Sequence, residues 1–432
     1  MVCHVAPASL HLRRAYAQAG GAREGLGALT SPLILVSGAT GYIASRLIPR
    51  LLDAGYRVRA LARHPLQLKG RAWFKRVEVI HADAASPSTL KRAFDGVDTA
   101  YYLIHNMSRG RDYNAIELDA ARNFAQAAEQ AGVQHIIYLG GLADPEGQIA
   151  PHMRSRIETG KVLRTGKAPV TEFRAGVIAG SGSISFEMIR FMTELFPVVP
   201  GPSWLKNKSQ PIAIQNVIDY LIAALENKNG QGKVFEIGGP AVTTYAELML
   251  RYARVRGLNR RMLLLPILPV WFMAFGVDLM TPVPYPIAYA LIEGLSADSI
   301  VNHPEALDIF PEIKLIAYDA AVKDALEKTN PLYIERVWED GTPGIKSLKH
   351  EGCFILHASP TIPQEERLGM RGKRHNIFGN LWIEHKPADL SSTLFFSPRG
   401  LMGFLYWFLF FPFHWFRFRG LMQRTAERNQ SP

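Results

Sequence analysis

Short apolar runs alternate with segments of helical spacing between Pro32 and Phe173. In the latter segments the apolar residues recur at every third or fourth position, which indicates amphipathic helices. Apolar strands separated by such helices are typical of a parallel sheet that is covered on both faces. The pattern predicts a doubly wound α/β domain, with strands at 33–37, 56–61, 77–81, 97–104, 135–139 and 170–173 and its clearest helices at 43–51, 112–132 and 155–164.

After Gly176 the spacing becomes less regular, as expected where a lobe that covers a substrate lies beside the sheet. Two apolar stretches in the remainder, 263–277 and 401–416, contain prolines and are shorter than the roughly 20 residues that span a bilayer. We interpret the first as a buried or interfacial segment. The second is either an aromatic helix packed on its own domain, which we favour, or an interfacial anchor flanked by arginines that meet lipid phosphates.

Residues 1–31 precede the first strand and carry three arginines among alanines and glycines, with Glu24 as their single acid. We predict a disordered extension here. A transit peptide is the alternative interpretation, although the glycines weaken the amphipathic helix that such a peptide needs. We expect this extension to be followed by a domain at 32–330, whose lobe is mainly 177–330, and by a C-terminal module at 331–432.

Composition and charge argue against several classes of function. The formal net charge is +11, but the 49 basic residues are spread along the chain without an arginine-rich run, so we predict no nucleic-acid partner. With only Cys3 and Cys353, the chain offers no disulfide framework, which favours the cytoplasm, with peripheral membrane contact as an addition. The 13 histidines have no close ligand spacing, so we predict no metal.

The segment Ser37–Ala44, SGATGYIA, lies between the first predicted strand and the first predicted helix. Gly38 permits a tight turn, and Gly41 lets the backbone approach a pyrophosphate without a side chain in the way. The helix then presents its free amides and the positive end of its dipole to the phosphates. The loop predicts a dinucleotide site that includes Gly38, Ala39, Thr40, Gly41, Tyr42 and Ile43.

The end of the second strand, VRALARH, has Arg63 where an NAD-binding site usually places an acid. A guanidinium there can hold the 2′-phosphate of NADP by paired hydrogen bonds, so we predict NADP(H), with NAD(H) as the alternative. An ordinary surface arginine is the competing interpretation. Asp83 is expected either to accept from the adenine amino group or to cap a turn. The predicted cofactor contacts are completed by Ala84, Leu103 and Gly140.

The loop, the Ala82-Asp83 step and the run Tyr138–Leu142 together resemble the atypical short-chain dehydrogenase/reductase group, near the NmrA-like proteins. The runs at 210–212 and 235–240 look like a bacterial branch whose members carry a C-terminal domain of the START-like (SRPBCC) helix-grip class. The C-terminal segments at 396–401 and 406–407 are similar to the closing signature of that domain, although 354–396 is shorter than in relatives. The resemblance implies an α+β helix-grip-like module after the Rossmann domain.

The resemblance also implies a catalytic serine, tyrosine and lysine, of which the tyrosine delivers the proton and the lysine holds the ribose. At the matching positions this chain has Gly141, His152 and Arg156, so the usual mechanism does not transfer. His152 can still act as an acid and Arg156 can hold ribose or substrate charge. The competing interpretation is that both are ordinary residues at the start of a surface helix.

Three functions follow from these patterns. The first is an oxidoreductase that uses the nicotinamide to reduce a small apolar carbonyl, enone or quinone. The second is a non-catalytic sensor or scaffold that binds NAD(P)(H), which the three departures from the catalytic set favour. The third is a lipid-handling protein at a membrane surface, which the stretch at 401–416 suggests.

Overall fold

The computed structural model describes residues 31–69, 71–105, 113–144, 146–147, 149–280, 283, 285–328, 354–358, 374–376, 378–385 and 392–428. The predicted extension at 1–31 lies outside these ranges, apart from its last residue.

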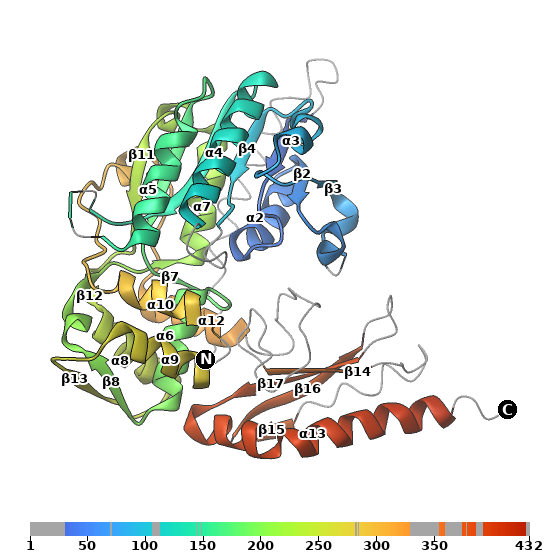
Figure 1. The fold of residues 1–432 in the computed structure, drawn as a ribbon, viewed down its shortest axis with the longest axis vertical. Helices are drawn as coiled ribbons and strands as arrows, with labels where there is room; N and C mark the ends of the chain where they lie inside the picture. Colours follow the sequence, from blue (N-terminus) through green and yellow to red (C-terminus); the bar gives the residue numbers. More distant parts are fainter. Residues whose placement is uncertain are drawn as a thin grey trace, which may run out of the picture.

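A seven-stranded parallel sheet forms the centre of the N-terminal domain (Figure 1). Its strand order is β11-β6-β5-β4-β1-β2-β3. The order reverses direction between β1 and β4, which is the topological switch point where doubly wound sheets bind ligands. The strands are β1 (Leu33–Val36), β2 (Arg57–Ala62), β3 (Glu78–His81), β4 (Thr99–Tyr102), β5 (His135–Gly141), β6 (Val170–Ala175) and β11 (Val234–Ile237).

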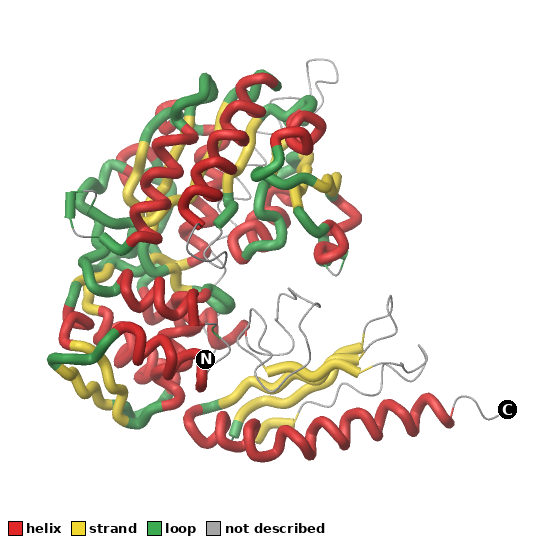
Figure 2. Tube along the Cα trace, viewed as in Figure 1, coloured by secondary structure: helices red, strands yellow, loops and turns green. Residues whose placement is uncertain are grey.

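Helices cover both faces of this sheet, as Figure 2 shows. On one face α2 (Tyr42–Asp53) and α7 (Ile214–Glu226) pack on a core that includes α11 (Ala306–Ile309). On the other face lie α3 (Pro87–Phe94), α4 (Tyr113–Gln130) and α5 (Pro151–Leu163). The predicted doubly wound domain is therefore confirmed, because every strand expected from the apolar runs is present in the sheet.

Two elements within the range that we assigned to the lobe belong to the sheet domain: α7 covers it and β11 extends its edge. The lobe itself is built around three helices, α6 (Ile184–Leu195), α8 (Tyr245–Arg256) and α12 (Tyr318–Lys328). Short strands accompany them at β7 (Ile178–Ala179), β8 (Val198–Pro202), β9 (Lys208–Ser209), β10 (Ile212–Ala213), β12 (Thr243–Thr244) and β13 (Arg261–Leu265).

The apolar stretch at 263–277 divides into the end of β13 and most of α9 (Val270–Met280), which packs on α10 (Tyr285–Gly294). Ala274 and Val277 of α9 are buried, whereas Trp271 and Phe275 are exposed. This helix is thus partly buried, as predicted. Among the residues that the structure describes, no helix combines the length and the apolar character that crossing a membrane requires.

The C-terminal module is a four-stranded antiparallel sheet with one long helix, α13 (Gly400–Arg428), packed against it. The strand order is β14-β17-β16-β15, from β14 (Phe354–Ala358), β15 (Arg374–Asn376), β16 (Gly379–His385) and β17 (Ser392–Pro398). Trp407 is fully buried and stacks on Phe354 and Phe396, at 5.1 and 5.4 Å between ring centroids. An α+β module is therefore present, and its helix-grip class stays a prediction.

Candidate active site

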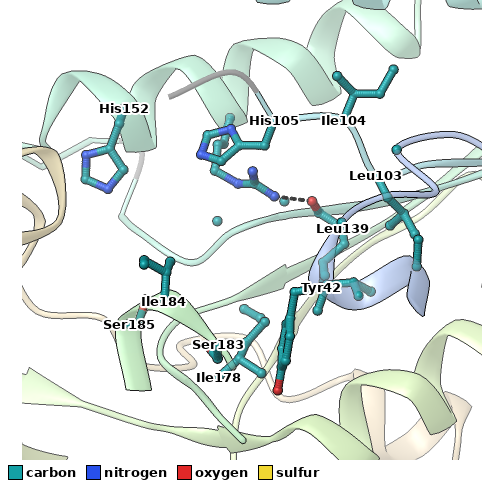
Figure 3. A pocket seen from close by; sticks show the side chains of 18 of the residues that line it. Tyr42, Leu103, Ile104, His105, Leu139, His152, Ile178, Ser183, Ile184 and Ser185 are labelled. Carbon is teal, nitrogen blue, oxygen red and sulfur yellow. Dashed lines mark hydrogen bonds between the residues drawn. The ribbon is translucent and has the colours of Figure 1, made fainter. Parts of the chain in front are cut away.

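A cleft of about 770 Å³ opens at the carboxyl ends of the strands, between the sheet and the lobe. Figure 3 shows its centre, where His105 and His152 come from different elements and lie across the cleft from Ile178, Ser183 and Ile184. One end of the cleft is formed by the turn between β1 and α2 and the other by apolar side chains of the lobe. All predicted site residues except Ala39 line this cleft.

The turn between β1 and α2 has the geometry that a pyrophosphate needs. Gly38 has φ +65°, and a Cβ atom at this position would lie 2.6 Å from the Leu103 carbonyl oxygen, so only glycine fits. Ala39 is fully buried below the turn. No side chain caps the N-terminus of α2, and its first turn holds no acid. Its free amides therefore fit an anionic group in the cleft.

Arg63 follows β2 and is exposed at the edge of the cleft. Its guanidinium makes no hydrogen bond or ion pair with the described residues, so the side chain can turn toward a ligand. Asp83 caps a turn, since its Oδ1 accepts a hydrogen bond of 3.0 Å from the Ala85 amide. The turn-capping interpretation of Asp83 is thus confirmed, while the residue still lines the cleft together with Ala84.

His152 and Arg156 lie in the cleft, because α5 begins at Pro151 and turns these positions toward the sheet. His152 is buried at 6% exposed, and its Nδ1 has no hydrogen-bond partner among the described residues, whereas Arg156 is half-buried. Burial, followed by the nearby His105 and Arg156, lowers the pKa of His152 to about 4. The Arg156 guanidinium donates to the Leu139 carbonyl oxygen.

Position 141, where the resemblance implies a serine, is closed to a larger side chain by the present packing. A Cβ atom on Gly141 would lie 2.9 Å from the Met153 sulfur and 3.3 Å from Cδ of Arg156. The space that a serine would occupy is thus filled from α5. Two of the three departures, Gly141 and Arg156, are thus in packing contact with each other.

A buried polar cluster that the sequence reasoning missed lies behind the cleft. Glu117 of α4 is fully buried, and its Oε1 lies 3.0 Å from Nδ1 of His105, which follows β4. Its Oε2 accepts a hydrogen bond of 2.7 Å from the Ser155 hydroxyl on α5. The sequence position of His105 could have indicated a site residue, because His105 lies just beyond the carboxyl end of a strand beside the switch point. In the sequence, Glu117 could not be told apart from an ordinary polar residue of a predicted helix.

The ionisation of this cluster follows from its contacts. Burial opposes ionisation of Glu117, but the hydrogen bond and charge of His105, the Arg156 guanidinium and the Ser155 hydroxyl together lower its pKa. Burial and the Arg156 guanidinium lower the pKa of His105, and Glu117 only partly offsets them. At neutral pH the pair is therefore a carboxylate that accepts from the Nδ1–H of a neutral imidazole.

The far end of the cleft has an apolar wall. It is lined by lobe side chains from α6 and α10 and from the segments beside them, among them Phe191, Val283, Leu291 and Leu295. Polar side chains also line the lobe side, at Ser183, Ser185, Glu187, Tyr245 and Ser299, and His105, His152 and Arg156 lie where the chamber meets the glycine loop. Such a chamber fits a molecule with a substantial apolar part and a polar group near the two histidines.

Comparison with known proteins agrees with this geometry. Residues 38–163 match the model of a family described as NAD(P)H-binding. The chain is 27% identical over 274 residues to the (4-alkanoyl-5-oxo-2,5-dihydrofuran-3-yl)methyl phosphate reductase of Streptomyces griseus, a match that covers 60% of this chain and 85% of the relative. It is 25% identical to a photosystem II assembly factor of Cyanophora paradoxa, over 54% of this chain and 72% of that protein.

Among solved structures, the chain is similar to the triphenylmethane reductase of Citrobacter sp. in complex with NADP(H). The TM-score is 0.56 at 22% identity, and the match covers 67% of this chain and 99% of that structure, which supports the fold. From the sheet order, the glycine turn and these matches, we conclude that the chain contains an NAD(P)H-binding Rossmann domain of the atypical short-chain dehydrogenase/reductase, NmrA-like kind.

Proposed function

We propose that this protein is an NADP(H)-dependent oxidoreductase that acts on an apolar carbonyl, enone or quinone. The observation that carries the proposal is the continuity of one cleft, which joins a dinucleotide cradle to an apolar chamber with imidazoles at the junction. When bound, a reduced nicotinamide supplies hydride. The protein supplies a cradle at Gly38 and Gly41, the 2′-phosphate contact at Arg63, and a chamber with an apolar wall for the substrate.

The relatives support a reductase of this kind. The Streptomyces griseus relative is named for reduction of an alkanoyl-oxo-dihydrofuran, a ring that carries a carbonyl beside a double bond. The Citrobacter structure is that of a reductase with NADP(H) bound. Hydride transfer to such conjugated acceptors does not require the tyrosine that this chain lacks at His152.

The test is titration of the purified protein with NADPH, NADP⁺ and NADH, followed by the absorbance of the reduced nicotinamide in the presence of enones, quinones and aldehydes. We expect tight binding of NADPH and its oxidation with at least one conjugated acceptor. Tight binding without turnover of any acceptor would instead favour the sensor or scaffold.

The non-catalytic alternative rests on one specific observation, the replacement of the catalytic set by Gly141, His152 and Arg156. The similarity to a photosystem II assembly factor is in keeping with it. A sensor is expected to bind the oxidised and reduced nucleotides with different affinity, and a scaffold to bind them equally. Neither is expected to consume NADPH.

We also propose peripheral membrane contact through 401–416. Along α13, exposed apolar side chains form one stripe, at Met402, Leu405, Leu409, Phe413 and Phe416. Exposed Arg399 and Arg417 flank the stripe, and the sequence has no acid between them. An apolar face bordered by arginines is complementary to an anionic lipid surface. We further propose that the C-terminal module begins at residue 331 and that it belongs to the helix-grip class.

Vesicle sedimentation tests the membrane contact. The full-length double variant Leu409→Ser/Phe416→Ser should lose most binding to vesicles of phosphatidylglycerol and phosphatidylcholine. Leu307→Ser, at an exposed leucine of α11 far from α13 in the sequence, is the matched control. Equal sedimentation of wild type and the double variant would refute membrane contact through 401–416.

A further inference from the structure

Two imidazoles reach the junction between the cradle and the apolar chamber, and among the described residues only one of them contacts a carboxylate. His105 has Nδ1 3.0 Å from the buried Glu117, whereas Nδ1 of His152 has no hydrogen-bond partner in the described part of the chain. In each ring the contact at one nitrogen governs what the other can do. The two histidines are therefore chemically unequal, although both line the cleft.

We propose that His105 is the acid that protonates the substrate oxygen, and that Glu117 is the positioning residue that holds its ring and supports its charged form. The proposal rests on the reductase function proposed above. It replaces His152, which the sequence singled out, with a residue that lies just beyond β4.

The contacts of Glu117 support the roles assigned to Glu117 and His105. Glu117 is fully buried and accepts from Ser155 through one oxygen, so its second oxygen remains directed at Nδ1 of His105. A ring whose Nδ1 is bound to this carboxylate can present only Nε2 to the cleft. Carboxylate and imidazole thus form the dyad in which a buried acid fixes the orientation of the ring and stabilises the imidazolium.

Burial of the His105 ring is the largest influence on its second proton and disfavours it, and the charges around the ring modify this effect. From α4 the Glu117 carboxylate favours the imidazolium, and from α5 Arg156 opposes it. For His152, on α5, burial and the charges of His105 and Arg156 disfavour the imidazolium, and none of the described carboxylates contacts its ring. Of the two imidazoles, His105 therefore has the stronger support for the proton that an acid must deliver.

The conjugated substrate accepts a hydride at carbon, from the reduced nicotinamide dinucleotide, and its carbonyl oxygen takes up the displaced electron pair. That oxygen then receives the Nε2 proton of the His105 imidazolium, so the N–H bond breaks and an O–H bond forms. Neutral His105, still bonded through Nδ1 to Glu117, regains its proton from water. The substrate class is accordingly an apolar enone or quinone whose reduction develops an oxyanion.

Nuclear magnetic resonance of the protein without nucleotide or substrate tests the dyad first. With ring-¹⁵N-labelled histidine, the His105 signal is identified by its absence from His105→Gln. We expect the neutral ring to carry its proton on Nδ1, and its titration to move at least about one pH unit lower in Glu117→Gln, because the carboxylate charge is lost. Ser155→Ala should move it less. A proton on Nε2, or an unchanged titration in Glu117→Gln, would overturn the proposal.

Turnover gives the second readout. His105→Gln should lower kcat roughly 10²- to 10⁴-fold and flatten the rise in rate toward lower pH, with the Kd for NADPH changed less than about threefold. His152→Gln should keep the pH profile. The opposite pattern, with the profile retained in His105→Gln and lost in His152→Gln, overturns the assignment.

Absence of turnover in the wild type would refute the reductase function, and with it the acid step. The resonance experiment would still report whether the dyad exists, so the two failures can be told apart.

Discussion

At the scale of single residues, Arg63 is the side chain by which we expect the two nicotinamide dinucleotides to be distinguished. It follows β2, lines the cleft and is exposed. A carboxylate at this position repels a 2′-phosphate and accepts from free ribose hydroxyls. Arg63→Asp should therefore weaken NADPH binding by about 10- to 30-fold, equivalent to roughly 1.5–2 kcal/mol, and strengthen NADH binding.

Fluorescence titration with each nucleotide measures this preference. Arg57→Asp is the matched control, because Arg57 is exposed at the opposite end of the same strand. If both variants weakened NADPH binding equally, a general charge effect would explain the result and the specific contact would be refuted.

A second residue-scale prediction concerns stability at acidic pH. His135 is 1% exposed, and its Nε2 lies 2.8 Å from the Thr171 hydroxyl, which itself donates to the Gly230 carbonyl oxygen. Burial lowers the pKa of His135 to about 4, below the 6.5 of an unhindered imidazole. Between these values the unfolded chain binds more protons, so the free energy of unfolding falls as the pH falls from 6.5 to 4.

His135→Gln keeps an N–H donor but cannot take up this proton. Its loss of stability between pH 6.5 and 4 should be smaller than that of the wild type by about 3 kcal/mol. Urea denaturation at several pH values measures the difference, with His303→Gln at an exposed histidine as control. The same pH dependence in wild type and His135→Gln would contradict the prediction.

At the scale of elements, the turn from β1 into α2 depends on a backbone that only glycine provides. In Gly38→Ala the new methyl group meets the Leu103 carbonyl oxygen at 2.6 Å, in addition to the cost of φ +65°. We expect the turn to move, nucleotide affinity to fall at least about 100-fold, and stability to fall by about 1–3 kcal/mol.

Gly55→Ala separates these effects. Gly55 has φ +87°, but a Cβ atom there has nothing within 4 Å. This control should lose stability through its backbone conformation alone and keep its nucleotide affinity. Isothermal titration with NADPH and thermal unfolding compare the pair, and unchanged affinity in Gly38→Ala would show that the turn does not hold the phosphates.

At the scale of the whole molecule, one buried carboxylate joins the lobe to the C-terminal module. Glu194 of α6 accepts from Tyr252 at 2.7 Å and from Arg256 at 2.9 Å, both on α8, and from the Gly400 amide at the start of α13. Glu194→Ala leaves Arg256 without its carboxylate partner and the end of α13 without its acceptor. We expect a loss of about 3–5 kcal/mol and faster hydrogen exchange along α13.

The exposed pair between Glu247 and Arg254 provides the comparison. Glu247→Gln should cost less than about 1 kcal/mol, since surface ion pairs contribute little. Chemical denaturation and exchange mass spectrometry read out both variants. If exchange along α13 stayed at the wild-type rate in Glu194→Ala, the module would have to be held by its apolar contacts alone.

The sequence by itself determined the local features of this protein. Apolar runs predicted the strands of the central sheet because a buried parallel strand excludes polar side chains from both faces. The glycine spacing predicted the turn before α2, because a positive φ at Gly38 is a property of one residue. Arg63 could be placed because it directly follows a strand.

Only the tertiary structure decided which side chains meet across long separations. Glu117 belongs to α4, and its partners His105 and Ser155 lie 12 and 38 residues away, so their convergence depends on how α4 and α5 pack against the sheet. The same packing buried His152, and the placement of α7 and β11 in the first domain also depended on long-range contacts. Periodicity records which face of an element is buried, but not against which partner, and the acid–base chemistry proposed here depends on that partner.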